Sequence, residues 1–339
     1  MAATVRCFGE LLLRLAAPDR QRLLQTPSLD VHIGGAEANV AVSLAAFGHD
    51  AGMISLVADN PLGAAATGEL RRHGVDTSRI RAAHGRMGLY FLVPGAIHRP
   101  SEVIYDRADS AFALADPAAY DWPALLQGAQ WLHLSGVSPA LGPEAANATI
   151  AAAAAAQALG VRVSFDGNFR PKLWERWNGD AAGILRQIMA RADVLFADHR
   201  DIAVVLGMRF DQAEAHERVQ AAADAAFAAF PSLQTLACTH RVAHSVDHHT
   251  LSAQLCRRGA GSVFAPPMEV AGIVDRIGGG DAFAAGVLHG LVTELPAEAA
   301  IGFGLAAACL KHSVPGDFNL VSLAEVQSLV DERRFDVRR

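Results

Sequence analysis

The sequence predicts an α/β fold with a mainly parallel central sheet and a small β-sheet lid. Short apolar runs rich in β-branched and aromatic residues alternate with longer runs rich in alanine and leucine. This alternation is typical of parallel strands that helices cover on both faces. Three further strand-like runs have no helix between them, and glycines precede two of the helical runs.

The elements follow in chain order. Strands are expected at 5–8, 52–57, 131–134, 161–165, 194–196 and 235–238. Helices are expected at 36–47, 61–72, 143–159, 181–191, 212–230, 280–291, 297–312 and 322–333. In such sheets ligands bind beyond the carboxyl ends of the strands, so polar residues that follow the strands are the candidates for a site.

The runs 11–15, 88–93 and 102–107 read as strands without intervening helices. They predict a lid over the main sheet, drawn from segments near 11–16, 30–34, 86–94 and 101–108. No linker-like or repetitive stretch divides the chain. We therefore expect one domain over residues 1–339, long enough for a large buried core.

Composition excludes several classes of protein. The chain has 339 residues, 51% hydrophobic and 19% charged, which is unlike a disordered chain. The net charge of −6 disfavours nucleic-acid binding. No apolar run is long enough to span a membrane, and no signal peptide is seen. Four scattered cysteines without a C-x-x-C pair argue against a disulfide scaffold and favour a cytoplasmic location.

The most informative stretch is the turn Gly278, Gly279 and Gly280, which Asp281 follows at the start of an alanine-rich helix. Glycines allow close approach of a ligand, and free N–H groups at a helix start bind anions. A carboxylate beside that anion suits a general base that deprotonates an attacking hydroxyl. An ordinary helix cap explains the turn taken alone about equally well.

Other phosphate and nucleophile motifs are missing. The sequence contains no G-x-x-x-x-G-K-[ST], no G-x-G-x-x-G that opens a helix after the first strand, and no G-x-S-x-G. These absences disfavour a Walker NTPase, a dinucleotide-binding dehydrogenase and an α/β-hydrolase.

A second glycine pair, Gly34 and Gly35, precedes a helix that carries Asn39 in its second turn. Together, the stretches 34–48 and 275–286 resemble the two signatures of the ribokinase-like (PfkB) carbohydrate kinases, and the similarity runs over nearly the whole chain. The resemblance implies a ribokinase-like three-layer sandwich, ATP and Mg²⁺ as cofactors, and a small-molecule sugar as substrate.

The stretches 89–91, 105–111, 166–174 and 315–319 look like the 2-keto-3-deoxygluconate kinase branch of this family. The resemblance implies that Asp281 is the catalytic base and that the 278–281 turn stabilises the phosphate charge. It also implies that Asn168 lies near the nucleotide phosphates. The residues it assigns to the sugar acid are Gly34, Gly35, Asn39, Tyr90, Tyr105, Arg107, Arg170 and Asp317.

The residue types support the sugar acid independently. Arginine forks suit a planar carboxylate better than neutral hydroxyls, and Arg170 follows a predicted strand while Arg107 lies on the predicted lid. Tyr90 and Tyr105 offer a flat apolar face with a hydroxyl. Taken singly, each arginine is more often a surface ion pair and each tyrosine a packing residue.

Two stretches depart from the family pattern. Where many members carry Asn-x-x-Glu, this chain has Asp198 and Asp201, which either hold Mg²⁺ through water or cap a helix. The nucleotide loop that starts at Thr239 lacks the usual glycines, although Thr239 can still bond a phosphate. Four histidines at 240, 244, 248 and 249 have zinc-like spacing, but a solvated hairpin is the better interpretation.

The sequence thus predicts a cytoplasmic kinase that transfers phosphate from ATP to a sugar acid, with 2-keto-3-deoxygluconate as the favoured substrate. The alternatives are a neutral-sugar kinase of fructose or ribose type, a noncatalytic sugar-binding regulator and a structural oligomer. A lid with exposed strand edges favours a homodimer.

Overall fold

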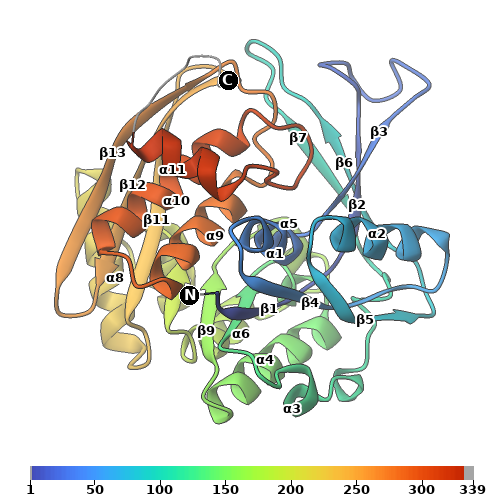
Figure 1. Cartoon of the computed structure of the whole chain (residues 1–339), viewed down its shortest axis with the longest axis horizontal. Coiled ribbons are helices and arrows are strands. Elements are labelled where there is room, and N and C mark those ends of the chain that lie inside the picture. The colour runs from blue at the N-terminus through green and yellow to red at the C-terminus, as the bar shows by residue number, and fades with distance from the viewer. Residues whose placement is uncertain (1, 332–339) are drawn as a thin grey trace.

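The computed structural model describes residues 2–331 (Figure 1). In these residues a nine-stranded sheet has the order β13-β12-β11-β10-β9-β8-β1-β4-β5. The strands from β11 to β5 in this order pair in parallel, whereas β12 and β13 are antiparallel at one edge. The strands of this sheet are β1 (Thr4–Phe8), β4 (Asp50–Ala58), β5 (Asp76–Ala83), β8 (Trp131–Ser135), β9 (Arg162–Asp166), β10 (Val194–Phe196), β11 (Thr235–Ala243), β12 (His248–Arg257) and β13 (Gly261–Ala271).

Helices cover both faces of this sheet, and each face has its own apolar core. One core joins the sheet to α1, α2, α9, α10 and α11, and the other joins it to α3, α4, α6, α7 and α8. The helices are α1 (Ala36–Ala46), α2 (Pro61–Arg72), α3 (Trp122–Leu125), α4 (Pro143–Ala158), α5 (Pro171–Glu175), α6 (Ala181–Met189), α7 (His199–Leu206), α8 (Ala215–Ala229), α9 (Gly279–Val292), α10 (Ala297–Lys311) and α11 (Leu323–Asp331), with short 3₁₀ turns at Pro117–Ala119 and Pro139–Leu141.

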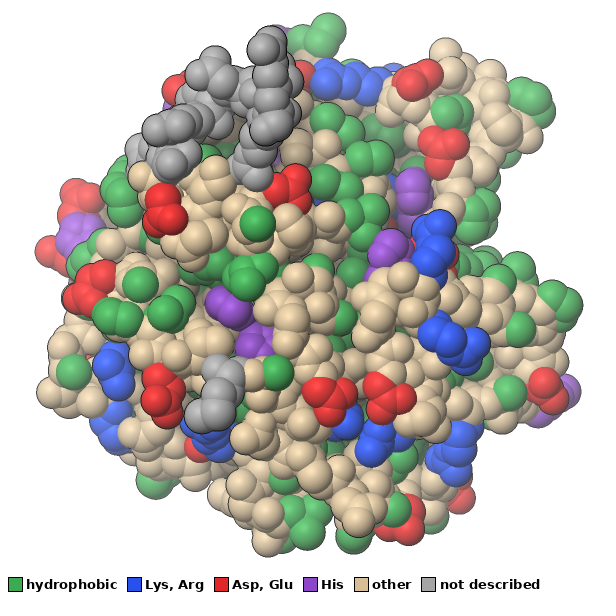
Figure 2. Space-filling view, in the orientation of Figure 1, with side chains coloured by type: hydrophobic (Ala, Val, Ile, Leu, Met, Phe, Trp, Pro, Cys, Tyr) green, Lys and Arg blue, Asp and Glu red, His purple; other side chains and the backbone are tan. Residues whose placement is uncertain are grey.

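A second sheet stands apart from the first at the upper right of Figure 1. Its order is β3-β2-β6-β7, with β2 and β6 parallel and the outer pairs antiparallel. The strands are β2 (Leu12–Ala16), β3 (Asp30–Gly34), β6 (Gly88–Val93) and β7 (Glu102–Asp106). We call this sheet the lid. Figure 2 shows the surface indented between the lid and the body.

The predicted α/β fold, with a mostly parallel sheet and a second small sheet, is confirmed. The expected strands and helices are present within a few residues, except that 332–333 of the last predicted helix lie outside the described residues. Strands β5, β12 and β13 were not predicted. The run of β5 is mostly polar or charged, because this edge strand is only partly buried, and the antiparallel edge formed by β12 and β13 breaks the βα alternation.

The structure also bears on the cysteines and on possible membrane-spanning helices. The four cysteines are buried free thiols, so no disulfide constrains the fold. Among the described residues, no helix has both the length and the apolar character needed to cross a membrane.

Candidate active site

A cavity of about 930 Å³ lies between the lid and the carboxyl ends of the parallel strands. Nearly all the predicted site residues line it, although they come from segments far apart in the sequence. The residues in question are Gly35, Asn39, Tyr90, Tyr105, Arg107, Asn168, Arg170, Asp198, Asp201, Thr239, Gly278, Gly280, Asp281 and Asp317. Two predicted residues, Gly34 and Gly279, do not line it. Gly279 lines an adjoining cavity of about 400 Å³.

The three glycines of the second turn have different surroundings. Gly278 is the N-cap of α9 with a φ of 80°, and a side chain there would overlap the carbonyl oxygen of Asp317. A Cβ at Gly279 would lie 2.9 Å from Cε1 of His312. Only Gly280 faces open space, with nothing within 4 Å. The side of Gly279 where a side chain would lie therefore packs against protein, and the space for an anion is found at Gly280.

The free N–H groups follow the same pattern. The N–H of Gly279 donates to the carbonyl of Arg276 over 3.3 Å. Among the described residues the N–H groups of Gly280 and Asp281 have no backbone acceptor. Both belong to the first turn of α9, where orphan donors and the positive end of the helix dipole attract anions.

Asp281 lies at the start of α9 with its carboxyl in the cavity wall. Burial raises its pKa to about 7. The side-chain amide of Asn39 donates to Asp281 Oδ2 over 2.7 Å and opposes that rise, while the charges of Glu37 and Asp317 add to it. A carboxyl that titrates near neutrality in a cavity is suited to general-base chemistry.

The first glycine pair shapes the wall opposite this turn. Gly35 is the N-cap of α1 with a φ of 145°, and a side chain there would overlap the carbonyl oxygen of Glu10. Gly34 packs against the carboxyl of Asp317. Glu37 is fully buried and accepts hydrogen bonds from Ser135 and Ser138, and its pKa is raised by burial.

Asp317 links the lid to the body. The hydroxyl of Tyr90 donates to Asp317 Oδ2 over 2.7 Å, and Arg14 lies 3.1 Å from Oδ1. Burial raises the pKa of Asp317, although Arg14 and the Tyr90 hydrogen bond oppose this rise. The two lid residues and the carboxyl are almost wholly buried.

The two predicted carboxylate-binding arginines have different partners. Arg107 follows β7, is buried, and donates through Nε to Glu10 over 2.6 Å. Glu10 also accepts from Ser110. Arg170 is the exposed N-cap of α5, and its only side-chain hydrogen bond in the described structure goes to the carbonyl of Phe169. Arg170 is therefore free to meet a ligand, whereas Arg107 already neutralises a buried carboxylate.

The acidic pair forms the cap of α7. Asp198 accepts from the N–H of Arg200, and Asp201 accepts from the N–H of Asp198 over 3.0 Å. Hydrogen bonds from Arg200 hold the pKa of Asp198 below its usual range against the effect of burial, whereas burial and the charge of Asp198 raise the pKa of Asp201 to about 6. The helix-cap interpretation is thus correct, and both side chains still line the cavity.

Several lining residues had no role in the sequence prediction, and three of them, Asp166, Arg241 and Arg276, are charged groups that could act on a ligand. Asp166 ends β9, and its pKa is raised by burial and by the charges of Asp281 and Asp201. Arg241 and Arg276 line both cavities, and no acidic side chain pairs with either of them in the described part of the chain. All three lie inside or beside the sequence motifs described above, at the carboxyl end of a predicted strand or next to the glycine turn. That position in the sequence could have identified them as candidate site residues.

The histidine stretch forms the predicted hairpin, with β11 and β12 as its arms. Its side chains are used separately: His240 bonds Gln254, His244 bonds Thr250 and His248 bonds Glu269. In residues 2–331 no group of three or more potential metal ligands is found. The predicted hairpin is confirmed, but His249 is buried rather than solvated.

Comparison with known proteins agrees with this geometry. Residues 2–322 match the model of the pfkB family carbohydrate kinases. The chain is 33% identical over 338 residues to a 2-dehydro-3-deoxygalactonokinase of Haloferax volcanii, covering 97% of both chains. It is 26% identical to a 2-dehydro-3-deoxygluconokinase of Bacillus subtilis, covering 97% of this chain and 98% of the relative.

Among solved structures, the 2-dehydro-3-deoxygluconokinase of Thermotoga maritima matches with a TM-score of 0.89 and 40% identity over 97% of this chain and 99% of its own. This chain belongs to the pfkB family of carbohydrate kinases. The family assignment and the enzyme class predicted from the two glycine signatures are therefore confirmed.

Proposed function

We propose that this protein is an ATP-dependent sugar-acid kinase that phosphorylates 2-keto-3-deoxygluconate to its 6-phosphate. The observation that carries the proposal is the position of Asp281, beside the open face of Gly280 and in one cavity with Arg170. The names of the relatives support a sugar acid as the acceptor.

In the proposed reaction the terminal hydroxyl of the sugar acid attacks the γ-phosphorus of ATP. The new oxygen–phosphorus bond forms as the bond to the bridging oxygen of ADP breaks, and the hydroxyl proton passes to Asp281. The N–H groups of the 278–281 turn, chiefly those of Gly280 and Asp281, hold the transferring phosphoryl group. The lid excludes water, which would compete as acceptor.

The polyphosphate of ATP is proposed to lie along Asn168, Thr239 and the glycine turn. Arg241 and Arg276 join this set, because both face the cavities without an acidic partner in the described structure. Two arginines close together also repel each other, and burial together with Arg276 lowers the pKa of Arg241. An anion between them removes that repulsion. Arg241→Gln is expected to raise KM for ATP and to leave KM for the sugar acid unchanged.

Mg²⁺ would accompany ATP and neutralise its phosphates. Asp198 and Asp201 offer the hard oxygen ligands that this ion prefers, but both already cap α7. Asp198 and Asp201 would therefore hold the ion indirectly, through water, since both side chains also line the cavity. The role of the two side chains is then to orient those waters.

The sugar-acid carboxylate is assigned to Arg170 and Arg107, with Tyr90, Tyr105, Asn39 and Asp317 along the rest of the substrate and the glycines Gly34 and Gly35 at its back. Arg170 offers the simpler test, because its side chain forms no ion pair in the described structure. Its charge lowers the pKa of the buried Asp166 and Asp281, so KM for the sugar acid is the quantity to compare. Arg107→Leu would strand Glu10, which is 1% exposed, so Arg107→Lys is the suitable change there.

The test is ADP production with a panel of sugar acids and neutral sugars. Arg170→Leu should raise KM for 2-keto-3-deoxygluconate by about 30- to 1,000-fold, equivalent to ~2–4 kcal/mol for a charged hydrogen bond, with KM for ATP nearly unchanged. Arg186→Leu, an exposed change on α6, is the matched control. Faster turnover of fructose or ribose, with no effect of Arg170→Leu, would favour the neutral-sugar alternative.

A homodimer through the lid is part of the proposal. Val31, Leu15, Phe91 and Ile104 lie opposite one another across the four strands and form an apolar row. Val31 and Ile104 are 60% and 45% exposed. A second copy of this face would cover the row and the open strand edges. Sedimentation of Ile104→Lys as a monomer, against a wild-type dimer, would support this assembly, and a monomeric wild type would contradict it.

We also propose a cytoplasmic location, which suits the free thiols.

A further inference from the structure

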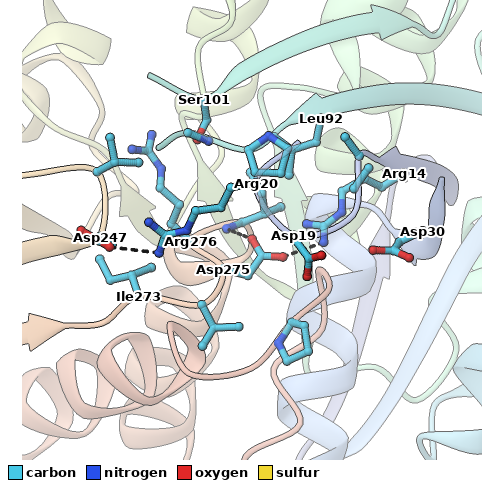
Figure 3. Close-up of a pocket in the computed structure, with 18 of the residues that line it drawn as sticks. Arg14, Asp19, Arg20, Asp30, Leu92, Ser101, Asp247, Ile273, Asp275 and Arg276 are labelled. Carbon is cyan, nitrogen blue, oxygen red and sulfur yellow. Dashed lines mark hydrogen bonds and ion pairs between the residues drawn. The ribbon is translucent and has the colours of Figure 1, made fainter. Parts of the chain in front are cut away.

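A buried arginine that the proposed reaction does not use connects the lid to the glycine turn. Arg14 lies on β2, and its side chain is 3% exposed. Nη2 lies 2.6 Å from Asp275 Oδ2, and Nη1 lies 3.1 Å from Asp317 Oδ1. Figure 3 shows Arg14 directed toward Asp275. One guanidinium of the lid thus holds two carboxylates of the body.

Each carboxylate positions a segment of the active site. Asp275 accepts hydrogen bonds from the N–H groups of Ile277 and Gly316, both over 3.0 Å, so it fixes the approach to the glycine turn and the loop that leads to Asp317. The carbonyl of Asp317 packs directly on Gly278. The turn, the loop and the lid strand therefore meet at Arg14.

Arg14 itself does not line the catalytic cavity. With Asp275 it lines a neighbouring cavity of about 750 Å³ on the other side of this network (Figure 3). Asp317 and Tyr90 line the catalytic cavity instead. Any effect of Arg14 on the reaction must therefore pass through its neighbours, which are the two carboxylates and Tyr90.

The charges of the network make the arginine hard to replace. Lys311 is also buried and donates to the carbonyl of Val314 over 2.9 Å. Both carboxylates favour the charged form of Lys311 against the effect of burial, which lowers its pKa overall. Without Arg14, two buried carboxylates would share this one ammonium, and an uncompensated buried charge drives rearrangement.

We propose that Arg14 is a positioning residue that couples the lid to the phosphate-binding turn. When the lid carries Arg14 into place, Asp275 and Asp317 are held, and with them the N–H groups that face the transferring phosphoryl group. The inference rests on the proposed use of the 278–281 turn. It goes beyond that use by giving the lid a role in assembling the anion site.

A matched control is available at the opposite end of the central sheet. Arg6 is also a buried arginine, 6% exposed, with two carboxylate neighbours, Asp50 at 3.2 Å and Asp76 at 3.9 Å. These carboxylates begin β4 and β5, at the amino ends of parallel strands and away from the cavity. Arg6→Met thus removes a buried arginine with two carboxylate partners without touching the turn, although these partners are more exposed, at 52% and 31%, than Asp275 and Asp317.

The experiment measures kcat and KM for Arg14→Met, Arg14→Lys and Arg6→Met, each assayed well below its melting temperature. Arg14→Met should lower kcat by about 30- to 300-fold, as expected when phosphoryl-binding groups are misplaced. KM for ATP should change less than threefold, and Arg14→Lys should recover part of the loss. Arg6→Met should melt earlier and keep kcat within threefold of wild type. Equal kcat for Arg14→Met and Arg6→Met would overturn the proposal.

Two further arms keep the test decisive. Asp275→Asn should reproduce the loss in kcat, and the double variant with Arg14→Met should lose no more than either single change. Additive losses would overturn the coupling. The assay uses both 2-keto-3-deoxygluconate and fructose as acceptors. A loss confined to the sugar acid would mean that Arg14 acts on the substrate carboxylate, whereas wild type that phosphorylates neither acceptor would sink the proposed function itself.

Discussion

The two glycine turns are alike in form and opposite in use. Each precedes a helix, and in each a glycine packs against a backbone carbonyl: Gly35 against Glu10, and Gly278 against Asp317. In the first turn of α1, Glu37 and Ala38 are wholly buried, and Asn39 lines the cavity. The first turn of α9 presents Gly280 to open space. One turn builds a wall, and the other builds a surface for a ligand.

The two turns meet where Asn39 donates to Asp281. A residue of the first helix thus lowers the pKa of a carboxyl on the second, against the larger effect of burial. The glycines of such a signature therefore serve two different purposes: some allow close packing of the chain on itself, and others leave space for a ligand. Substitutions at single positions can separate them.

The largest effect is expected at the base. Asp281→Asn keeps the shape of the side chain and removes its basicity, so kcat should fall by about 10²- to 10⁴-fold, the usual worth of general-base catalysis. The affinity for ATP, measured by titration calorimetry, should change little. Turnover near that of wild type would remove Asp281 from the mechanism.

The second-largest effect is expected at Gly280, where the turn has space for a ligand and no packing contact. Gly280→Val fills the open space next to Asp281 without meeting any protein atom within 4 Å of the new Cβ. We expect kcat/KM for ATP to fall by about 10²-fold, comparable to loss of an oxyanion-hole donor, with the melting temperature unchanged.

Gly302→Ala on α10 is the control for Gly280→Val, because Gly302 also has nothing within 4 Å and lies on a helix outside the cavity. It should raise stability slightly, by about 0.5–1 kcal/mol, and leave activity alone. If Gly280→Val retained full activity, the open face of the turn would not be the phosphoryl site.

Only part of the structure of the two glycine turns could be predicted from the sequence. Their positions, the helices that follow them and the place of Asp281 at a helix start were predictable, because glycine conformation and helix propensity act locally. The different environments of Gly278, Gly279 and Gly280 were not, because His312 and Asp317 approach them from remote segments.

The same limit applies to the arginines. Arg107 was predicted as a substrate ligand from the family resemblance and from its residue type, but its buried partner Glu10 lies 97 positions away in the chain. Arg14 could not be predicted for the same reason: its two carboxylates lie in remote segments, Asp275 at the start of the stretch 275–286 and Asp317 within the stretch 315–319. Which charge a buried arginine meets depends on how the lid packs on the body.

A smaller effect tests the packing role. Gly278→Ala combines a left-handed φ of 80° with overlap of the Asp317 carbonyl, and it should lower the free energy of unfolding by about 1–3 kcal/mol. Gly48 has a similar φ of 86° and nothing within 4 Å, so Gly48→Ala isolates the cost of the backbone angle. Equal destabilisation by both changes, measured by urea unfolding, would show that contact with the Asp317 carbonyl adds nothing.

The smallest effect tests the contact between the two turns. Asp281 must be deprotonated to act as a base, so with a pKa of about 7 the value of kcat/KM should rise with pH through neutrality and level off above it. Asn39→Ala removes a hydrogen bond that favours the charged carboxylate, and the pKa of Asp281 should therefore rise further. The acid limb of the profile should move upward by about one unit, since one unit corresponds to ~1.4 kcal/mol, within the range for hydrogen bonds to charged groups. At pH 6 the variant should lose up to about tenfold in kcat/KM, whereas at pH 9 it should approach its plateau.

Because Asn39 also lines the cavity, its loss can lower the plateau through substrate contacts, and the position of the limb rather than its height is the measurement that counts. An acid limb that stays in place, or moves downward, would mean that the first glycine turn positions the substrate without tuning the base on the second.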